Sequence, residues 1–199
     1  MTVFQLLMLG ASAFFAYKIY QHIQTLKDPN NNENNNSDRP RSVDAFSTFN
    51  AQSLIDKADD ARENGDLDKA LAIYSEANIK EPNSAETLFK MGYTLALQER
   101  DDEALEYYKE SLELDKDNPF VHQAMASIYR KTQEYASARM HLNASLALDD
   151  SNPITYFNYG NLLNDMKLTS EAKDMYKKAI ELDNDFTQAI EELKKLEGE

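Results

Sequence analysis

Four alanines recur at a constant interval of 34 residues along this chain: Ala70, Ala104, Ala138 and Ala172. A fixed period of this length indicates repeated helix-turn-helix units, because each unit must place the same small side chain where its two helices touch. The alternative is an ordinary helical bundle with chance spacing. We therefore expect an all-α chain of stacked antiparallel helix pairs, and a function in binding.

Other positions share the register of these alanines. The register divides the chain into units at residues 51–84, 85–118, 119–152 and 153–186. A second small column contains Ala58, Gly92, Ala126 and Gly160, and a third contains Ala77, Ser111, Ser145 and Ala179. A large column contains Tyr74, Tyr108, Leu142 and Tyr176. Because small side chains let helices approach closely, these columns predict the packing contacts.

This column pattern resembles that of the tetratricopeptide repeat (TPR) family, whose unit is two antiparallel helices of this length. In the first unit, residues 65–67 match the family's turn and Pro82 its end. Later units lack that proline, but Pro119 and Pro153 stand where the next helix begins, a position that tolerates proline. The resemblance implies a right-handed superhelical solenoid. Residues 187–199 have one apolar and one polar side, as expected of a capping helix.

The composition argues against catalysis and metal binding. The chain has no cysteine, which excludes disulfides and thiolate ligands. Its three histidines, His22, His122 and His141, are scattered and have no ligand partner at a spacing that repeats in another unit. Neither a glycine-rich phosphate loop nor a Ser/His/Asp set is recognisable. We expect no enzyme activity, no cofactor and no metal.

The negative charge lies on the repeats. The chain has a net charge of −14, while residues 1–50 carry four basic and four acidic side chains, which leaves 17 basic and 31 acidic side chains for the remainder. Such a surface repels nucleic acid, and no Lys/Arg cluster offsets it. The acidic excess favours solubility, and a second interpretation is that it also selects a basic partner.

Residues 1–27 are predicted to form a membrane anchor. Val3–Tyr17 has no charged residue, and extending this run to Ile23 gives a helix of about 32 Å, enough to cross a bilayer if the Lys18 amine reaches the headgroups. A cleaved signal peptide is an alternative, but the segment lacks a basic start. A buried helix of the solenoid is another, but the segment lies outside the repeat register. An uncleaved single-pass transmembrane helix fits best.

The residues around this span predict its orientation and a tether. No Lys or Arg precedes the span, and Lys18, Lys27, Arg39 and Arg41 all follow its start, so the positive-inside rule places the repeats in the cytoplasm; an extracytoplasmic, periplasmic location is the alternative. The asparagine-rich residues 28–50 predict a flexible linker. Within it, Phe46 and Phe49 are candidates for a packing extension of the solenoid or a second docking motif.

In the TPR family the first helix of each unit lines a concave groove, and the resemblance carries the groove columns onto this chain. The predicted partner-binding residues are Phe89, Lys90, Tyr93, Phe120, Gln123, Arg130, Phe157, Asn158 and Asn161. The same columns also contain Gln52, Ile55, Asp59, Arg62, Ser127, Lys131 and Asn164. The four aromatic residues are expected to be binding anchors, and the two asparagines suit a peptide backbone. Space filling between units is the alternative role for the aromatic residues.

One family specificity is predicted to be absent. The clamp that holds acidic chaperone tails uses Lys, Asn and Arg at set groove columns. Here those columns contain Ile55, Asp59 and Lys90 in one register, and Phe89, Tyr93 and Ala124 in the next. We therefore expect a peptide or helix with apolar anchors, and with basic residues near Asp56, Asp59 and Asp60. The chain is interpreted as a membrane-tethered scaffold for a protein partner; self-assembly into homo-oligomers is the alternative.

Overall fold

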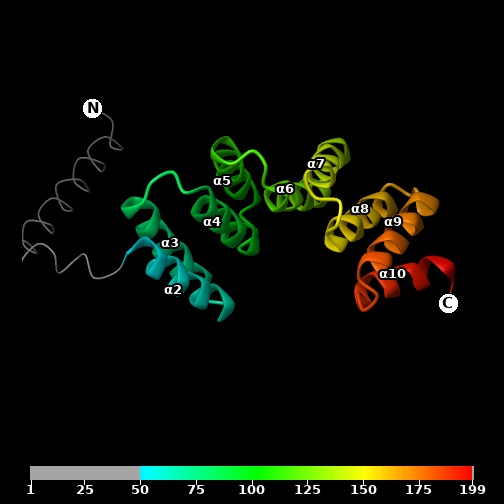
Figure 1. The fold of residues 1–199 in the computed structure, drawn as a ribbon, viewed down its shortest axis with the longest axis horizontal. Helices are drawn as coiled ribbons and strands as arrows, with labels where there is room; N and C mark the ends of the chain where they lie inside the picture. The colour runs from blue at the N-terminus through cyan, green and yellow to red at the C-terminus, as the bar shows by residue number, and fades with distance from the viewer. Residues whose placement is uncertain (1–49, 199) are drawn as a thin grey trace, which may run out of the picture. The chain divides into compact units, whose positions relative to one another are not determined.

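The computed structural model describes residues 50–198, which are helical with short connections (Figure 1). The helices are α2 (Ala51–Glu63), α3 (Leu67–Lys80), α4 (Ala85–Leu97), α5 (Asp101–Leu114), α6 (Pro119–Lys131), α7 (Tyr135–Leu148), α8 (Pro153–Asp165), α9 (Thr169–Leu182) and α10 (Thr187–Glu197). No strand occurs in this range, and none of its helices is long and apolar enough to cross a membrane. The predicted anchor and, apart from Asn50, the predicted linker lie outside the described residues.

The helices pack in pairs that follow chain order. The strongest packing is within α2–α3, α4–α5, α6–α7 and α8–α9. Three residues join the helices of each pair, which makes the two helices antiparallel neighbours. Each second helix also packs on the first helix of the next pair, and α10 packs on α9. The all-α repeat architecture predicted from the alanine period is confirmed.

Each first helix begins at a side-chain cap. The caps are Asn50, Ser84, Asn118 and Asn152, and each accepts a hydrogen bond from a backbone N–H of the first turn. Such caps satisfy amide groups that have no partner within the helix. Pro119 and Pro153 follow the last two caps, at the first helical position. The helix starts predicted from these prolines are confirmed.

The small columns mark the tightest contacts. All four alanines of the 34-residue period are 0% exposed. At Gly92 an added Cβ would lie 2.7 Å from Cε1 of Tyr108, and at Gly160 an added Cβ would lie 2.5 Å from Cε1 of Tyr176. Both distances are shorter than any normal carbon contact, so each tyrosine ring occupies the space that a larger residue would need. The packing roles predicted for the small and large columns are confirmed.

Two of the histidines described as scattered meet in the third pair. The Nδ1 atoms of His122 and His141 lie 2.9 Å apart, so one ring donates a hydrogen bond and the other accepts it. His141 is buried, and its other face stacks on Tyr129 with ring centroids 5.4 Å apart. Burial lowers the pKa of both rings; the pKa of His141 falls to about 4, with the neighbouring charge of His122 as a further cause.

The histidine pair predicts loss of stability at acidic pH. An unfolded histidine has a pKa of about 6.5. Between pH 6.5 and 4, His141 is therefore protonated in the unfolded chain but neutral in the folded protein. The pair's contribution is therefore complete above pH 6.5 and is lost as the pH falls toward 4, by roughly 3 kcal/mol. Urea unfolding at pH 7.0 and 4.5 measures it. In the variant His141→Met, which copies Met175 of the fourth unit, the urea midpoint should fall less between pH 7.0 and pH 4.5 than it does in the parent protein. Equal losses in the two proteins would contradict the prediction.

Candidate partner-binding face of the first helices

The first-helix face consists of the side chains of α2, α4, α6 and α8 that the groove prediction selects. Polar bridges connect α2 to α4 across this face. Lys90 Nζ donates to Asp59, and the Arg62 guanidinium lies 5.5 Å from the centre of the Tyr93 ring. Asp59 also accepts a hydrogen bond of 2.5 Å from the buried Tyr74 hydroxyl of α3. The carboxylate of Asp59 therefore holds the first two units together.

The electrostatics of Asp59 follow from these partners. Partial burial by itself raises the pKa of the carboxyl, but the hydrogen bonds from Lys90 and Tyr74 and the charges of Lys90 and Arg62 outweigh it, so the pKa is lowered. Burial and the bond to Asp59 raise the pKa of Tyr74 to about 12. Lys90, which the groove prediction offers to a partner, is already neutralised by a carboxylate from the neighbouring unit.

Three apolar side chains follow one side of α4. Phe89, Tyr93 and Leu97 are spaced four residues apart, so they share a helical face. Tyr93 and Leu97 are 41% and 46% exposed. Phe89 is half-buried, and its ring centroid lies 5.8 Å from that of Tyr108. Phe89 therefore supports the face from below, while the other two side chains present apolar surface to solvent.

The next two first helices each add one exposed apolar side chain, in the repeat column that α4 fills with Glu86. Phe120 of α6 is 52% exposed and Ile154 of α8 is 50% exposed. Gln123 does not belong to the open surface: it is buried, and its Nε2 donates to Thr155 Oγ1 at 2.6 Å. The groove assignment of Gln123 is corrected accordingly, because the amide is used to bridge two units.

The remaining predicted residues also make contacts within the protein. Arg130 forms an ion pair of 2.8 Å with Asp165, and Asn161 accepts a hydrogen bond of 2.8 Å from the Tyr176 hydroxyl. Phe157 is half-buried, with its ring centroid 5.9 Å from that of Tyr176 and 5.1 Å from that of Phe186. Asn158 is half-buried on α8. Phe157 thus fills space between the last pair and the cap, the alternative role considered for the aromatic residues.

Sequence reasoning missed two exposed apolar residues, Leu97 and Ile154. Both had a signal in the sequence. Leu97 lies four residues after Tyr93, and Ile154 lies 34 residues after Phe120. With them, the exposed apolar part of the face consists of Tyr93, Leu97, Phe120 and Ile154. We call these four residues the apolar row.

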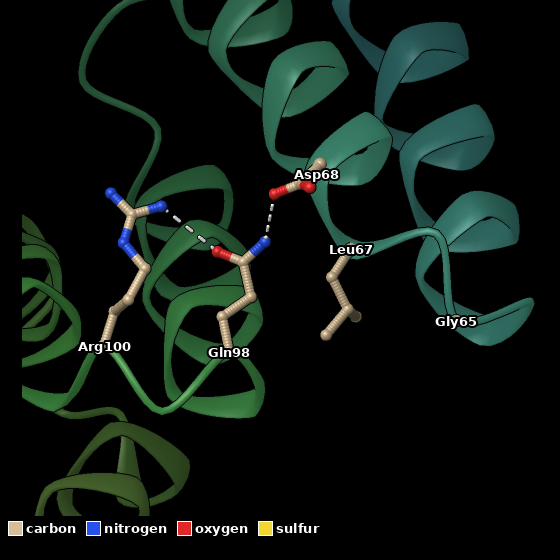
Figure 2. A pocket seen from close by; sticks show the side chains of 5 residues that line it. All are labelled: Gly65, Leu67, Asp68, Gln98 and Arg100. Atoms are coloured by element: carbon tan, nitrogen blue, oxygen red, sulfur yellow. Dashed lines mark hydrogen bonds between the residues drawn. The ribbon is translucent and has the colours of Figure 1, made fainter.

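A hollow of about 480 Å³ lies at the turns of the first two pairs (Figure 2). In Figure 2, Gln98 stands between its two partners: its Nε2 donates to Asp68 at 2.7 Å, and its Oε1 accepts from Arg100 at 3.2 Å. The hollow is lined by polar turn residues with Leu67 as the one large apolar side chain. These hydrogen bonds link consecutive turns. Among residues 50–198 no group of three or more His, Asp or Glu side chains is arranged to hold a metal ion.

Comparison with known proteins connects this architecture to a family. Tetratricopeptide repeat family models match residues 48–117 and 154–186. The curated RNA polymerase II-associated protein 3 of Rattus norvegicus is 26% identical over 168 residues, which are 83% of this chain and 26% of that protein. The chain thus spans only about a quarter of the length of this relative.

Solved structures show the same fold. A crystal structure of MamA is 25% identical, with a TM-score of 0.62 over 70% of this chain and 81% of the other. The first TPR domain of Spaghetti (RPAP3), solved with the HSP90 peptide SRMEEVD, is 28% identical, with a TM-score of 0.55 over 57% of this chain and 90% of that domain. The second structure shows that a repeat domain similar to this one binds a peptide.

The Asp59 bridge predicts a large cost for one substitution. Asp59→Ala should lower the free energy of unfolding by about 1–3 kcal/mol, because it leaves the buried Tyr74 hydroxyl and Lys90 without their acceptor. Chemical denaturation followed by circular dichroism measures the change. The matched control is Asp56→Ala on the exposed side of the same helix, which should stay within about 0.5 kcal/mol of the parent. Similar effects of the two substitutions would rule out the bridge as a stabilising contact.

Proposed function

Because the chain contains tetratricopeptide repeats, we propose that it is a scaffold that binds a peptide or helix of a protein partner on its first-helix face. The observation that carries the proposal is the apolar row. Its four side chains are 41–52% exposed on successive first helices, although the core does not need them. Exposed aromatic and aliphatic side chains with polar neighbours are typical of the places where binding energy concentrates.

The charge of the face favours a partner that is apolar and basic. The acidic tail of the HSP90 peptide in the related structure carries carboxylates. Here Lys90 is paired with Asp59, and Arg130 with Asp165, so two cations of this face are already neutralised. An acidic tail would have to displace a carboxylate from each of these cations. A partner with Lys or Arg beside apolar anchors can pair instead with acidic side chains outside these two ion pairs, and the acidic excess of the repeats attracts it.

The proposal includes tethering to a membrane through residues 1–27. It rests on the uncharged run Val3–Tyr17 and on the Lys and Arg residues that follow it. A tethered scaffold raises the local concentration of its partner at the bilayer without any new contact. Self-association of the chain remains a separate prediction, which sedimentation of the full chain in detergent tests.

Truncation of three residues of the apolar row should weaken partner binding without unfolding the protein. We expect short random peptides selected on the full chain to be rich in aromatic and aliphatic anchors beside Lys or Arg. The triple substitution Tyr93→Ala, Phe120→Ala and Ile154→Ala should weaken the selected peptides about tenfold or more, because it removes exposed anchors. Fluorescence anisotropy measures the affinity, and circular dichroism the fold.

A matched triple variant controls for nonspecific apolar binding. Leu114, Leu148 and Leu182 are also exposed leucines of one column, but they lie at the ends of the second helices. Their replacement by alanine should leave the affinity unchanged. The peptide SRMEEVD should bind more weakly than the selected peptides. Equal losses in the two triple variants would refute the proposed face, and tight binding of SRMEEVD would refute its proposed charge preference.

A reporter of membrane topology tests the tether and its orientation. A fusion of a cytoplasm-dependent reporter after Glu199 should be active, because all four basic residues near the span follow its start. A fusion of an export-dependent reporter at the same place should be inactive. Deletion of residues 3–23 should release the protein from the membrane fraction. Activity of the export-dependent fusion would overturn the orientation, and retention of the deleted form in membranes would overturn the anchor.

A further inference from the structure

The outward side of α7 carries no charge. Its exposed residues are Ala136, Met140, Asn143 and Ala147, which we call the α7 face. Their spacing of four, three and four residues places them on one side of the helix. Met140 is 60% exposed at the centre of the face, and small side chains lie on both sides of it. A helix partner can approach such a surface closely.

Seven of the eight equivalent positions in the neighbouring pairs are charged. In α5 they are Asp102, Glu106, Lys109 and Glu113, and in α9 they are Ser170, Asp174, Lys177 and Glu181. All eight side chains are exposed. The four second helices therefore supply a comparison: the equivalent surface carries four charged residues in α5, three in α9 and one, Asp68, in α3, where it also contains Ala72, Ser75 and the exposed Ile79. Among the four, only the α7 face carries no charge. Packing within the pair does not explain this difference, because the outward side of α7 does not contact α6.

The one charged residue of α7 turns away from the α7 face. Arg139 is half-buried, and its Nη2 donates to Met166 Sδ at 3.7 Å. The opposite side of α7 packs on α6 through buried residues that include Ala138 and Leu142. The α7 face thus points away from the first-helix face, and the two surfaces can be occupied at the same time.

We propose that the α7 face is a second docking surface, which takes an amphipathic helix with apolar residues along its centre and Lys or Arg on both sides. Charge complementarity selects this occupant: the equivalent surfaces of the pairs before and after it carry net charges of −2 and −1, counted from the eight residues above. A second copy of this chain would bring the same acidic surfaces together, which disfavours it. Met140 supplies an adaptable apolar contact, and the small residues let the two helices approach.

A designed peptide probes this surface directly. The probe is a helical peptide with a central stripe of leucine and alanine flanked by lysine, labelled for fluorescence anisotropy with the full chain in non-ionic detergent. Met140→Glu should weaken its binding about tenfold, because the change removes the apolar contact. The same change adds a negative charge, so attraction of the lysines to an acidic protein would instead strengthen binding. Weaker binding to Met140→Glu therefore indicates apolar contact with the α7 face, and stronger binding indicates general charge attraction.

Two further variants complete the test. The triple substitution of Tyr93, Phe120 and Ile154 should leave binding of this probe unchanged, which separates the α7 face from the first-helix face. Glu106→Gln with Asp174→Asn should weaken binding and reduce its dependence on salt. Failure of the probe to bind, equal binding to Met140→Glu, or loss of binding in the triple variant would overturn the proposal. Sedimentation that shows a dimer lost in Met140→Glu would also overturn it, in favour of a second copy as occupant.

Discussion

Close contact between helices at small residues is the constraint on which the rest of this structure depends. The alanines of the 34-residue period have no exposed surface, and the tyrosine rings beside Gly92 and Gly160 fill the space where a side chain would stand. Because every unit repeats this contact, each pair has nearly the same geometry, and the next pair docks in the same way. Packing thus determines which positions are unavailable for binding, and the remaining positions are free to differ between units.

The polar contacts between units are less regular than the packing. Asp59 receives Lys90 and Tyr74 in the first two units, whereas Gln123 bridges to Thr155 in the last two. Each bridge takes side chains that the family's groove columns would otherwise present to a partner. Fewer groove-column side chains are therefore free of internal contacts than the column pattern suggests, and the exposed apolar side chains of the first helices are those of the apolar row.

The helix pairs could be predicted from the sequence because they depend on local spacing, as the alanine period and the cap residues show. The burial and the contacts of individual groove residues could not be predicted, because they depend on contacts between units. Gln123 and Phe157 occupy the same column, yet one is buried in a hydrogen bond and the other packs on Phe186. The meeting of His122 and His141 was missed for a different reason: it lies within one pair, but the two positions are 19 apart in the chain and have no counterpart in another unit. Likewise, Gln133 and Lys167 adopt a positive φ at the turn position of Gly65, which residue type alone does not indicate.

A single electrostatic argument connects the two surfaces. The repeats carry 14 more acidic than basic side chains, counted from 31 and 17, so any partner must tolerate a negative field. Charge can steer a partner but gives little affinity at exposed positions, because water and salt screen it. Affinity therefore has to come from apolar contact, and exposed apolar side chains gather where the packing columns leave room. In the proposed function, the negative field of the repeats therefore favours basic partners, and the apolar row and the proposed α7 face supply the apolar contacts.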